Sequence, residues 1–118
     1  MKTVKRGEVH LVKPDPAAVG KEQQKQRPYG VVSNDVLNAT AGLVVVCPIT
    51  DAEGKKPDVI HILAKQREGG LVKESIILCE QMKAVDVERL IEKFGNLEAE
   101  TMRKIDAGLR LVLNLQRS

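Results

Sequence analysis

The stretch LVVVCPI, Leu43–Ile49, is an unbroken apolar run made mostly of valine and isoleucine. Runs of β-branched residues without polar alternation are typical of a strand that is buried on both faces. Pro48 has no N–H to donate, so we expect the hydrogen-bond ladder to be incomplete near the end of this strand. The run predicts a central strand around which the rest of the fold is arranged.

Shorter apolar stretches on both sides of this run predict further strands, because glycine, proline, asparagine and aspartate bound them. The turn-forming pair Asn34-Asp35 ends one of them, and the polar pair Glu80-Gln81 predicts a bulge between the last two. The predicted strands are Glu8–Val12, Tyr29–Ser33, Val59–Leu63, Ser75–Cys79 and Met82–Val85.

The hydrophobic period changes after Val85. Asp86 is suited to cap a short helix, VERLIEKF (87–94), which would stop at Gly95. A longer helix begins at about Glu98, where apolar residues recur at helical spacing, and Gly108 inside it predicts close packing against a neighbour. Six short strands followed by helices predict one domain, residues 1–118, that is mainly β (α+β by content), with a small β-barrel and a C-terminal helix.

The composition excludes several classes of protein. The chain of 118 residues is long enough for one domain with a core. It shows no signal peptide and no apolar run of membrane-spanning length, so we expect a cytoplasmic protein without a membrane partner. Cys47 and Cys79 lie in apolar runs and are expected to be small buried hydrophobes. The cysteines, His10 and His61 lack the spacing of metal ligands, so we expect neither a metal nor another cofactor.

Positive charge is concentrated at one end of the chain. The formal net charge is +3, whereas residues 1–30 hold seven basic and three acidic residues and therefore carry +4. A basic segment of this kind favours a polyanionic partner. A basic face that only meets solvent is an equally good interpretation of the charge alone.

Several polar residues are placed where they could do chemistry. Arg27 precedes Pro28, which fixes its own φ and pushes the arginine toward extended geometry at the entrance to a strand. Glu22 lies upstream in the same loop, and Thr50 ends the central strand. Each also has a plainer interpretation, as a surface arginine, a salt-bridge carboxylate and a turn-forming threonine. Ser75, Glu80 and Gln81 flank a predicted strand and are either rim hydrogen-bonding groups or ordinary edge residues.

The order of short motifs along the chain resembles the MazF/PemK family of toxins. The motifs are KRGEV at the first strand, DP, the EQ of the loop followed by RP, VVSND, PIT, SIILCEQ and VDVERL, and the helical end LEAETMRKIDAGLRLVLNL. The similarity spans nearly the whole chain. No single motif is specific, but their common order is.

The resemblance implies an SH3-like small β-barrel with a C-terminal helix, a homodimer and a cognate antitoxin as partner. It also implies a metal-independent endoribonuclease that cleaves single-stranded mRNA to 2′,3′-cyclic phosphate and 5′-hydroxyl ends. By position in the motifs, Arg27 and Thr50 are catalytic, and Glu22 contributes to RNA binding or acid–base work. We expect the RNA contacts to come from Lys21, Gln23, Lys25, Asp51, Ser75, Glu80 and Gln81.

The chain departs from the family pattern at two points, and two other functions stay open. Lys21 stands where some relatives carry a histidine, and His10 stands where an aromatic residue is usual. A non-catalytic RNA-binding barrel would use the same basic loop, but one Tyr and one Phe make a poor stacking platform. A gyrase poison of the CcdB type would need an aromatic C-terminal tail, whereas this chain ends in LNLQRS and contains no tryptophan.

Overall fold

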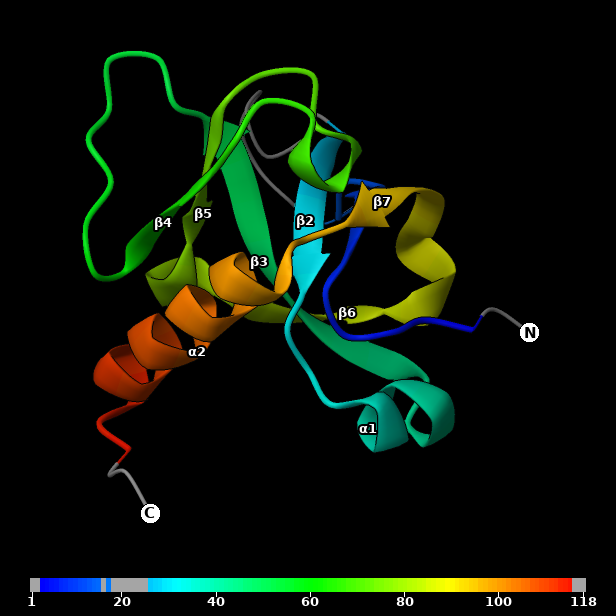
Figure 1. Cartoon of the computed structure of the whole chain (residues 1–118). Helices are drawn as coiled ribbons and strands as arrows, with labels where there is room; N and C mark the ends of the chain where they lie inside the picture. The colour runs from blue at the N-terminus through cyan, green and yellow to red at the C-terminus, as the bar shows by residue number, and fades with distance from the viewer. Residues whose placement is uncertain (1–2, 16, 18–25, 116–118) are drawn as a thin grey trace.

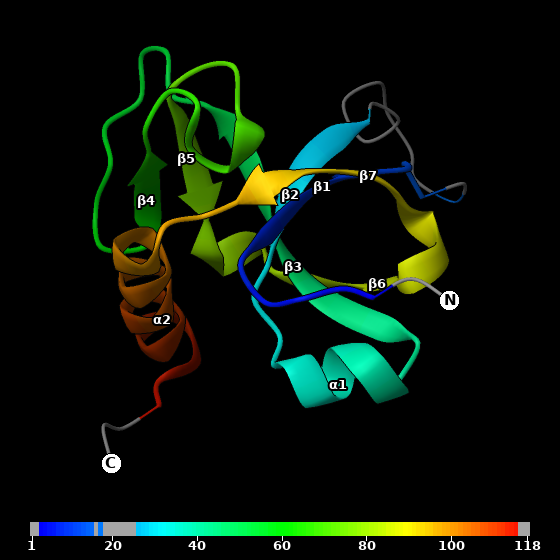
Figure 2. The same cartoon turned by 45° about the vertical axis from the view of Figure 1, so that its right-hand side comes forward.

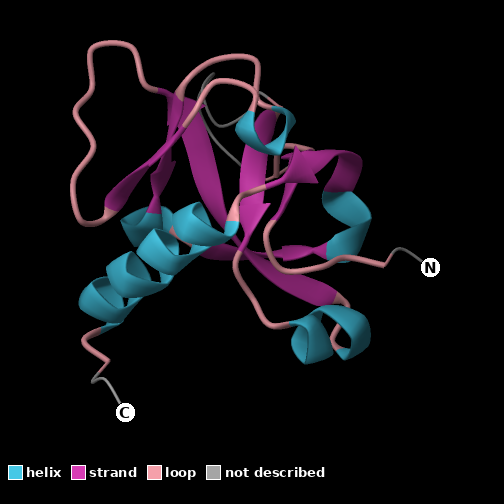
Figure 3. Cartoon of the chain, in the orientation of Figure 1, coloured by secondary structure: helices cyan, strands magenta, loops and turns pink. Residues whose placement is uncertain are grey.

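The structure is a computed structural model that describes residues 3–15, 17 and 26–115. Within these residues the chain forms seven strands, two α-helices and three short 3₁₀ turns (Figures 1 and 3). In chain order they are β1 (Glu8–Val12), β2 (Arg27–Val31), α1 (Asp35–Thr40), β3 (Leu43–Asp51), β4 (His61–Ala64), a 3₁₀ turn (Glu68–Gly70), β5 (Ser75–Leu78), a 3₁₀ turn (Cys79–Gln81), β6 (Lys83–Asp86), a 3₁₀ turn (Val87–Arg89), β7 (Leu90–Asn96) and α2 (Ala99–Leu113). The fold is therefore mainly β with a C-terminal helix, as predicted.

The strand β3 is the centre of the sheet, as the run of valines predicts. The strand order is β4-β5-β3-β2-β1-β7, and β6 also pairs with β3. One edge of β3 pairs antiparallel with β2. The other edge pairs first with β6, through Leu43–Val46, and then with β5, from Ile49 onward. Pro48 lies in the gap between these two partners, where its missing N–H costs no ladder bond.

Helix α2 lies beside β4 at one side of the curved sheet (Figure 2). Two apolar clusters lie on opposite faces of this sheet. The first fills the space between the sheet and α2 and consists of Val9, Val32, Cys47, Ile49, Ile62, Ala64, Leu71, Ile77, Cys79, Leu97, Met102 and Ile105. The second lies inside the curl and consists of Val4, Val12, Val31, Val44, Val46, Val85 and Leu90. β3 contributes alternate residues to each cluster, which is why its stretch Leu43–Ile49 shows no polar positions.

Helix α2 is the C-terminal helix that the sequence predicts. It buries Met102 and Ile105 against the sheet, and Gly108 faces the 3₁₀ turn that follows β5. A Cβ atom at Gly108 would lie 2.9 Å from both Cys79 Sγ and Val59 O, so the predicted close packing is confirmed. In the described parts of the chain, no helix combines the length and the apolar character needed to cross a membrane.

Two of the predicted elements are wrong. The segment 87–94 is not a helix: Asp86 accepts a hydrogen bond from the N–H of Glu88 and starts only one 3₁₀ turn, after which β7 pairs with β1. The pair Asn34-Asp35 does not form a plain turn, because the Asn34 side chain caps α1, a helix that the sequence analysis did not predict. The pairing of β1 explains why the predicted helix 87–94 is wrong. One edge of β1 pairs with β2, and its other edge pairs with β7, which contains most of this segment.

Several boundaries also differ from the prediction. β2 begins at Arg27 rather than Tyr29, and β4 begins at His61 rather than Val59. The polar pair Glu80-Gln81 belongs to a 3₁₀ turn rather than a bulge. The structure shows a strongly curved sheet; the SH3-like barrel stays a prediction from the resemblance.

Candidate active site

Arg27 is the first residue of β2 and lies at one end of the curved sheet. Its strand pairs with β1, which places Arg27 opposite Val12 and Tyr29 opposite His10. Pro28 holds the chain extended here and faces Leu11 in the ladder. Arg27 is half-buried. Its backbone is thus fixed by a strand while its guanidinium lies at the strand's open end.

Thr50 lies on the neighbouring strand β3 at the same end of the sheet. β2 and β3 pair through Tyr29 with Pro48 and Val31 with Val46. The pairing of β2 with β3 ends at Tyr29 and Pro48; continued for two more residues of each strand, the same register would set Arg27 opposite Thr50. Directly opposed residues of an antiparallel pair have Cβ atoms about 4.5–5.5 Å apart. Continued in this way, the register would bring together the side chains of Arg27 and Thr50, the two candidates from the sequence.

Both side chains also share a face and lack partners. Side chains alternate along a strand, so Arg27 and Thr50 project on the same face as Tyr29 and Pro48. Thr50 is half-buried like Arg27. Within the described part of the chain, neither side chain makes a hydrogen bond or an ion pair. The side chains of Arg27 and Thr50 are therefore both available to a ligand.

Asp51 and Ser75 face each other on β3 and β5, next to Thr50. Asp51 Oδ1 accepts a hydrogen bond from the N–H of Glu53 at 2.9 Å, and Lys73 Nζ lies 3.4 Å from Asp51 Oδ2. The Glu53 N–H is the main cause, and Lys73 a further one, of a lowered Asp51 pKa. The Ser75 hydroxyl is buried and donates to the carbonyl of Lys73 at 2.8 Å. Ser75 therefore shapes the turn that carries Lys73 rather than facing solvent.

Glu80 and Gln81 lie in the 3₁₀ turn that links β5 to β6. Gln81 is exposed, while Glu80 Oε2 lies 2.8 Å from His61 Nε2. On its other side His61 Nδ1 lies 3.1 Å from Asp58 Oδ2. The contact with Glu80 is the main cause of a raised His61 pKa, which burial opposes and Asp58 reinforces. This cluster of His61 between two carboxylates could not be found from the sequence, because Glu80 lies 19 residues away from His61 along the chain.

A buried ionic group lies on β1, the strand that pairs with β2. Glu8 Oε1 lies 2.9 Å from His10 Nε2 and accepts from the N–H of Lys5, and Glu8 Oε2 lies 3.1 Å from Lys93 Nζ. Burial works against the charged form of Glu8, but these three partners outweigh it and lower its pKa. His10 is buried. Its contact with the carboxylate of Glu8 gives it a structural role.

The basic N-terminal third is only partly available to a ligand. Arg6 is bound within the protein, through Nη2 to Asp106 and through Nε to the carbonyl of Val32 at 3.0 Å. Four residues of the predicted site, Lys21, Glu22, Gln23 and Lys25, lie outside the described residues.

The two cysteines behave as the sequence predicts. Cys47 and Cys79 are free and buried. Burial raises the pKa of Cys47 to about 12 and that of Cys79 to about 11. Neither thiol is a nucleophile at neutral pH. Among the described residues, His, Cys, Asp and Glu nowhere gather in a group of three that could hold a metal ion.

A family model described as "PemK-like, MazF-like toxin of type II toxin-antitoxin system" matches residues 5–113. The chain belongs to this toxin family. A curated relative, Endoribonuclease EndoA of Bacillus subtilis (strain 168), is 35% identical over 112 residues, which make up 95% of this chain and 96% of the relative. The family membership that the ordered motifs indicate is therefore confirmed.

Solved structures show that the MazF-like chain also has the fold of this family. A MazE–MazF crystal structure (Form-II) from Deinococcus radiodurans matches with a TM-score of 0.79 at 21% identity, over 98% of this chain and 100% of that one. An endoribonuclease in complex with its cognate antitoxin from Mycobacterial species matches with a TM-score of 0.77 at 19% identity, over 100% of both chains. At these identities the likeness concerns the fold alone.

Proposed function

We propose that this MazF-like toxin is an endoribonuclease that cleaves single-stranded RNA, with Arg27 and Thr50 as its reacting groups. The observation that supports the proposal is the register of β2 and β3, which, continued two residues beyond Tyr29 and Pro48, would set these two unpartnered side chains opposite each other. The relative EndoA, named an endoribonuclease and similar over 95% of the chain, supports the same activity.

The proposed reaction uses the 2′-hydroxyl of the RNA itself as the nucleophile. The 2′-oxygen attacks phosphorus, the bond from phosphorus to the 5′-oxygen breaks, and the products carry a 2′,3′-cyclic phosphate and a 5′-hydroxyl. One proton leaves the 2′-oxygen and another reaches the 5′-oxygen. Negative charge builds on the non-bridging oxygens during this step, so the main task of the enzyme is to stabilise that charge.

Each residue of the site suits one part of this task. Arg27 stays charged at every physiological pH and donates several N–H groups, so it stabilises the phosphorane. Thr50 donates its hydroxyl to a non-bridging oxygen. Glu22, which lies outside the described residues, is assigned as proton acceptor. The mechanism requires no metal and no other cofactor, because the nucleophile belongs to the substrate.

The RNA path follows from the placement of the remaining residues. Asp51 adjoins Thr50 in β3, and Gln81 is exposed on the 3₁₀ turn Cys79–Gln81, which lies against β3. We assign Gln81 and Glu80 to contacts with base edges, and Lys21, Gln23 and Lys25 of the loop to contacts with the backbone. Single-stranded RNA is the fitting substrate, because its bases can be splayed and its backbone can adopt the in-line geometry.

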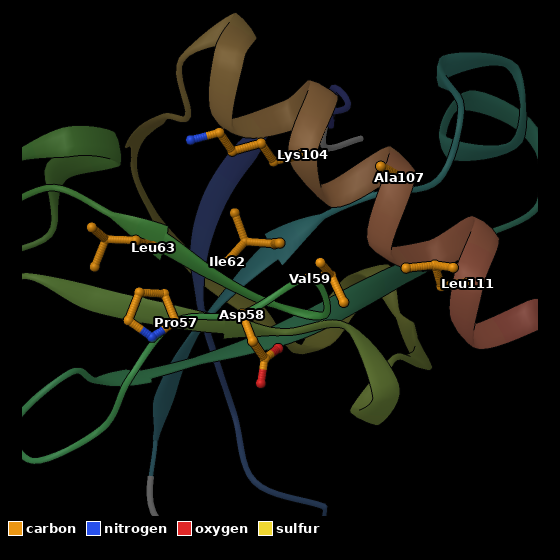
Figure 4. Close-up of a pocket in the computed structure, with 8 residues that line it drawn as sticks. All are labelled: Pro57, Asp58, Val59, Ile62, Leu63, Lys104, Ala107 and Leu111. Atoms are coloured by element: carbon orange, nitrogen blue, oxygen red, sulfur yellow. The ribbon is translucent and has the colours of Figure 1, made fainter.

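We further propose a homodimer that packs through an apolar groove between α2 and β4 (Figure 4). The groove has a volume of about 590 Å³ and is lined by Pro57, Asp58, Val59, Ile62, Leu63, Lys104, Ala107 and Leu111. Val59 and Leu111 are 69% and 60% exposed, which is unusual for residues of this type at the rim of a groove. A second copy would cover them by a two-fold contact, the commonest symmetry of homo-oligomers.

The dimer is tested with one charged substitution and one matched control. Leu111→Asp should shift sedimentation toward the monomer and lower the cleavage rate. Val36→Asp, on α1 at a residue that is 75% exposed and far from the groove, should change neither. A wild-type protein that sediments as a monomer at micromolar concentration and still cuts at full rate would rule the dimer out.

The proposed partner besides RNA is an acidic antitoxin segment. Similar folds have been solved together with antitoxins, in the MazE–MazF and mycobacterial complexes. We propose that a partly disordered acidic segment folds onto the cations that bind RNA and competes with it. Inhibition should weaken as salt rises, together with RNA binding. We place the toxin in the cytoplasm, where its proposed substrate is found.

The activity is tested by incubating the protein with a long single-stranded RNA in EDTA and analysing the fragment ends. The proposal expects cleavage at a limited set of sites, leaving 5′-hydroxyl and cyclic-phosphate ends. Cleavage that EDTA abolishes and magnesium restores would contradict the mechanism. An intact RNA at all protein concentrations would contradict the function.

A further inference from the structure

Tyr29 is an aromatic side chain placed beside the reaction centre. It lies two residues beyond Arg27 on the same face of β2, which corresponds to about 7 Å along a strand. The register sets it opposite His10 on one side and Pro48 on the other. The chain contains one Tyr, one Phe and no Trp. The single phenylalanine, Phe94, packs against the other apolar cluster, so Tyr29 is the aromatic group of this face.

The ring of Tyr29 is held in place but not enclosed. It is half-buried and packs against the valine cluster inside the curl of the sheet. Lys83 Nζ lies 5.0 Å from the ring centroid, a distance typical of a cation–π contact. Lys83 is an exposed residue of β6 and reaches the ring from beyond β3, where it pairs with Val46. In the described part of the chain the Tyr29 hydroxyl has no hydrogen-bond partner.

We propose that Tyr29 and Lys83 form a nucleotide subsite next to the reaction centre, in which the ring stacks on one base and the ammonium binds a phosphate. The proposal rests on the RNA cleavage proposed above and adds a substrate-positioning residue to it. One ring makes a site for one base, which differs from the multi-base platform that the low aromatic content excludes.

The contact with Lys83 explains how the subsite stays formed without RNA. A flexible lysine covers a face of the ring and keeps water from part of it. When RNA arrives, a phosphate attracts the ammonium more strongly than the ring does, and the base takes the place that Lys83 leaves. Base–aromatic stacking tolerates any base but favours those that stack best. Tyr29 therefore biases which nucleotide lies beside the scissile bond.

Tyr29 can be observed directly, because it is the only tyrosine of a chain without tryptophan. Tyrosine fluorescence is recorded while a short RNA is added whose ribose at the cleavage position is 2′-deoxy, so that it binds without being cut. We expect the emission to be quenched by stacking. The same RNA with an abasic nucleotide at the neighbouring position should bind and leave the emission nearly unchanged. Full quenching by the abasic RNA would overturn the proposal.

Substitutions separate stacking from packing. Tyr29→Trp and Tyr29→Phe keep a ring and should retain kcat/KM within a few-fold. Tyr29→Leu keeps apolar volume and should lower kcat/KM by about ten- to a hundredfold, mainly through KM. The Tyr29→Leu variant should also cut at a broader set of sites. Phe94→Leu is the matched control, since it removes the other ring from a different cluster and should leave the cleavage-site distribution unchanged.

Lys83→Met tests the phosphate contact. It should weaken binding and reduce the slope of log K against log salt by about one. Lys65→Met, on an exposed lysine paired with Glu98, is its control. If wild-type protein cleaves RNA and Tyr29→Leu cuts the same sites at the same rates, the subsite is wrong while the function stands. If wild-type protein cuts no RNA, the proposed function itself fails.

Discussion

Substitution of Gly108 by alanine tests the packing that fixes α2 on the sheet. Two effects oppose each other. Alanine is the better helix former by about 1 kcal/mol in a helix interior. However, its Cβ would lie 2.9 Å from Cys79 Sγ, 2.9 Å from Val59 O and 3.5 Å from Ile60 Cα. The helix therefore has to move away from the segment before β4 and from the turn after β5. Overpacking of this kind typically costs 1–3 kcal/mol.

The overpacking should win, because one of the two closest atoms is a backbone oxygen that cannot rotate away. We expect a net loss of about 1–2 kcal/mol of unfolding free energy, which corresponds to a Tm lower by about 3–10 °C for a chain of this length. Thermal unfolding followed by circular dichroism at one fixed protein concentration measures it.

The double substitution Gly108→Ala with Cys79→Ala removes one of the clashing atoms. It should lose less stability than the sum of the two single substitutions. Ala107→Gly, at an exposed position of the same helix that also lines the proposed dimer groove, should cost about 1 kcal/mol through helix propensity when it is measured in the Leu111→Asp background. A Gly108→Ala protein as stable as wild type would refute the close approach of α2 to the turn after β5.

Three further outcomes follow from the ionisable groups. The pKa of His61 is raised above its ordinary value of 6.5, so the contribution of His61 to stability is complete below pH 6.5 and is lost as the pH rises through the pKa of the folded protein. His61→Gln should therefore flatten the curve of Tm against pH in this range. The pKa of Glu8 is lowered from 4.5, so the contribution of Glu8 to stability is lost as the pH falls through the pKa of the folded protein. Glu8→Gln should lower the unfolding free energy by about 1–3 kcal/mol at neutral pH and by less in acid. Cys47 and Cys79 should resist a thiol reagent in native protein at pH 7 and react together once denaturant is added, whereas rapid native reaction would contradict their burial.

The strands and the last helix could be predicted because each carries its own pattern. Leu43–Ile49 is apolar throughout since β3 feeds two clusters on opposite faces, and α2 shows a helical stripe because only one of its faces meets the sheet. The segment 87–94 was misleading for a physical reason. Val87, Leu90, Ile91 and Phe94 have helical spacing, but the free edge of β1 recruits the segment as a strand, and that requirement is not local.

The site was predictable in part. Arg27 and Thr50 stand out through the proline and the strand end beside them, and through the family resemblance. Their juxtaposition depends on the register of β2 and β3, which the sequence does not contain. The helix α1 has no buried apolar stripe, since Val36 is 75% exposed, so its capping residue Asn34 was the one signal that could have indicated it. The contact between Tyr29 and Lys83 joins β2 and β6, which are separated by β3. The spacing of the two residues in the sequence could not have indicated it.

The central claim, that Arg27 and Thr50 together form the reaction centre, is tested most directly by single-turnover cleavage of one RNA in EDTA. Wild-type protein is compared with Arg27→Ala and Thr50→Ala, and circular dichroism and Tm confirm that each variant is folded. Each substitution should lower the rate constant by about 10²–10³, the usual loss for one charge-stabilising donor. The double variant should be little slower than the worse single variant, because the two groups act on one phosphate. A folded Arg27→Ala protein that cuts at the wild-type rate would contradict the account.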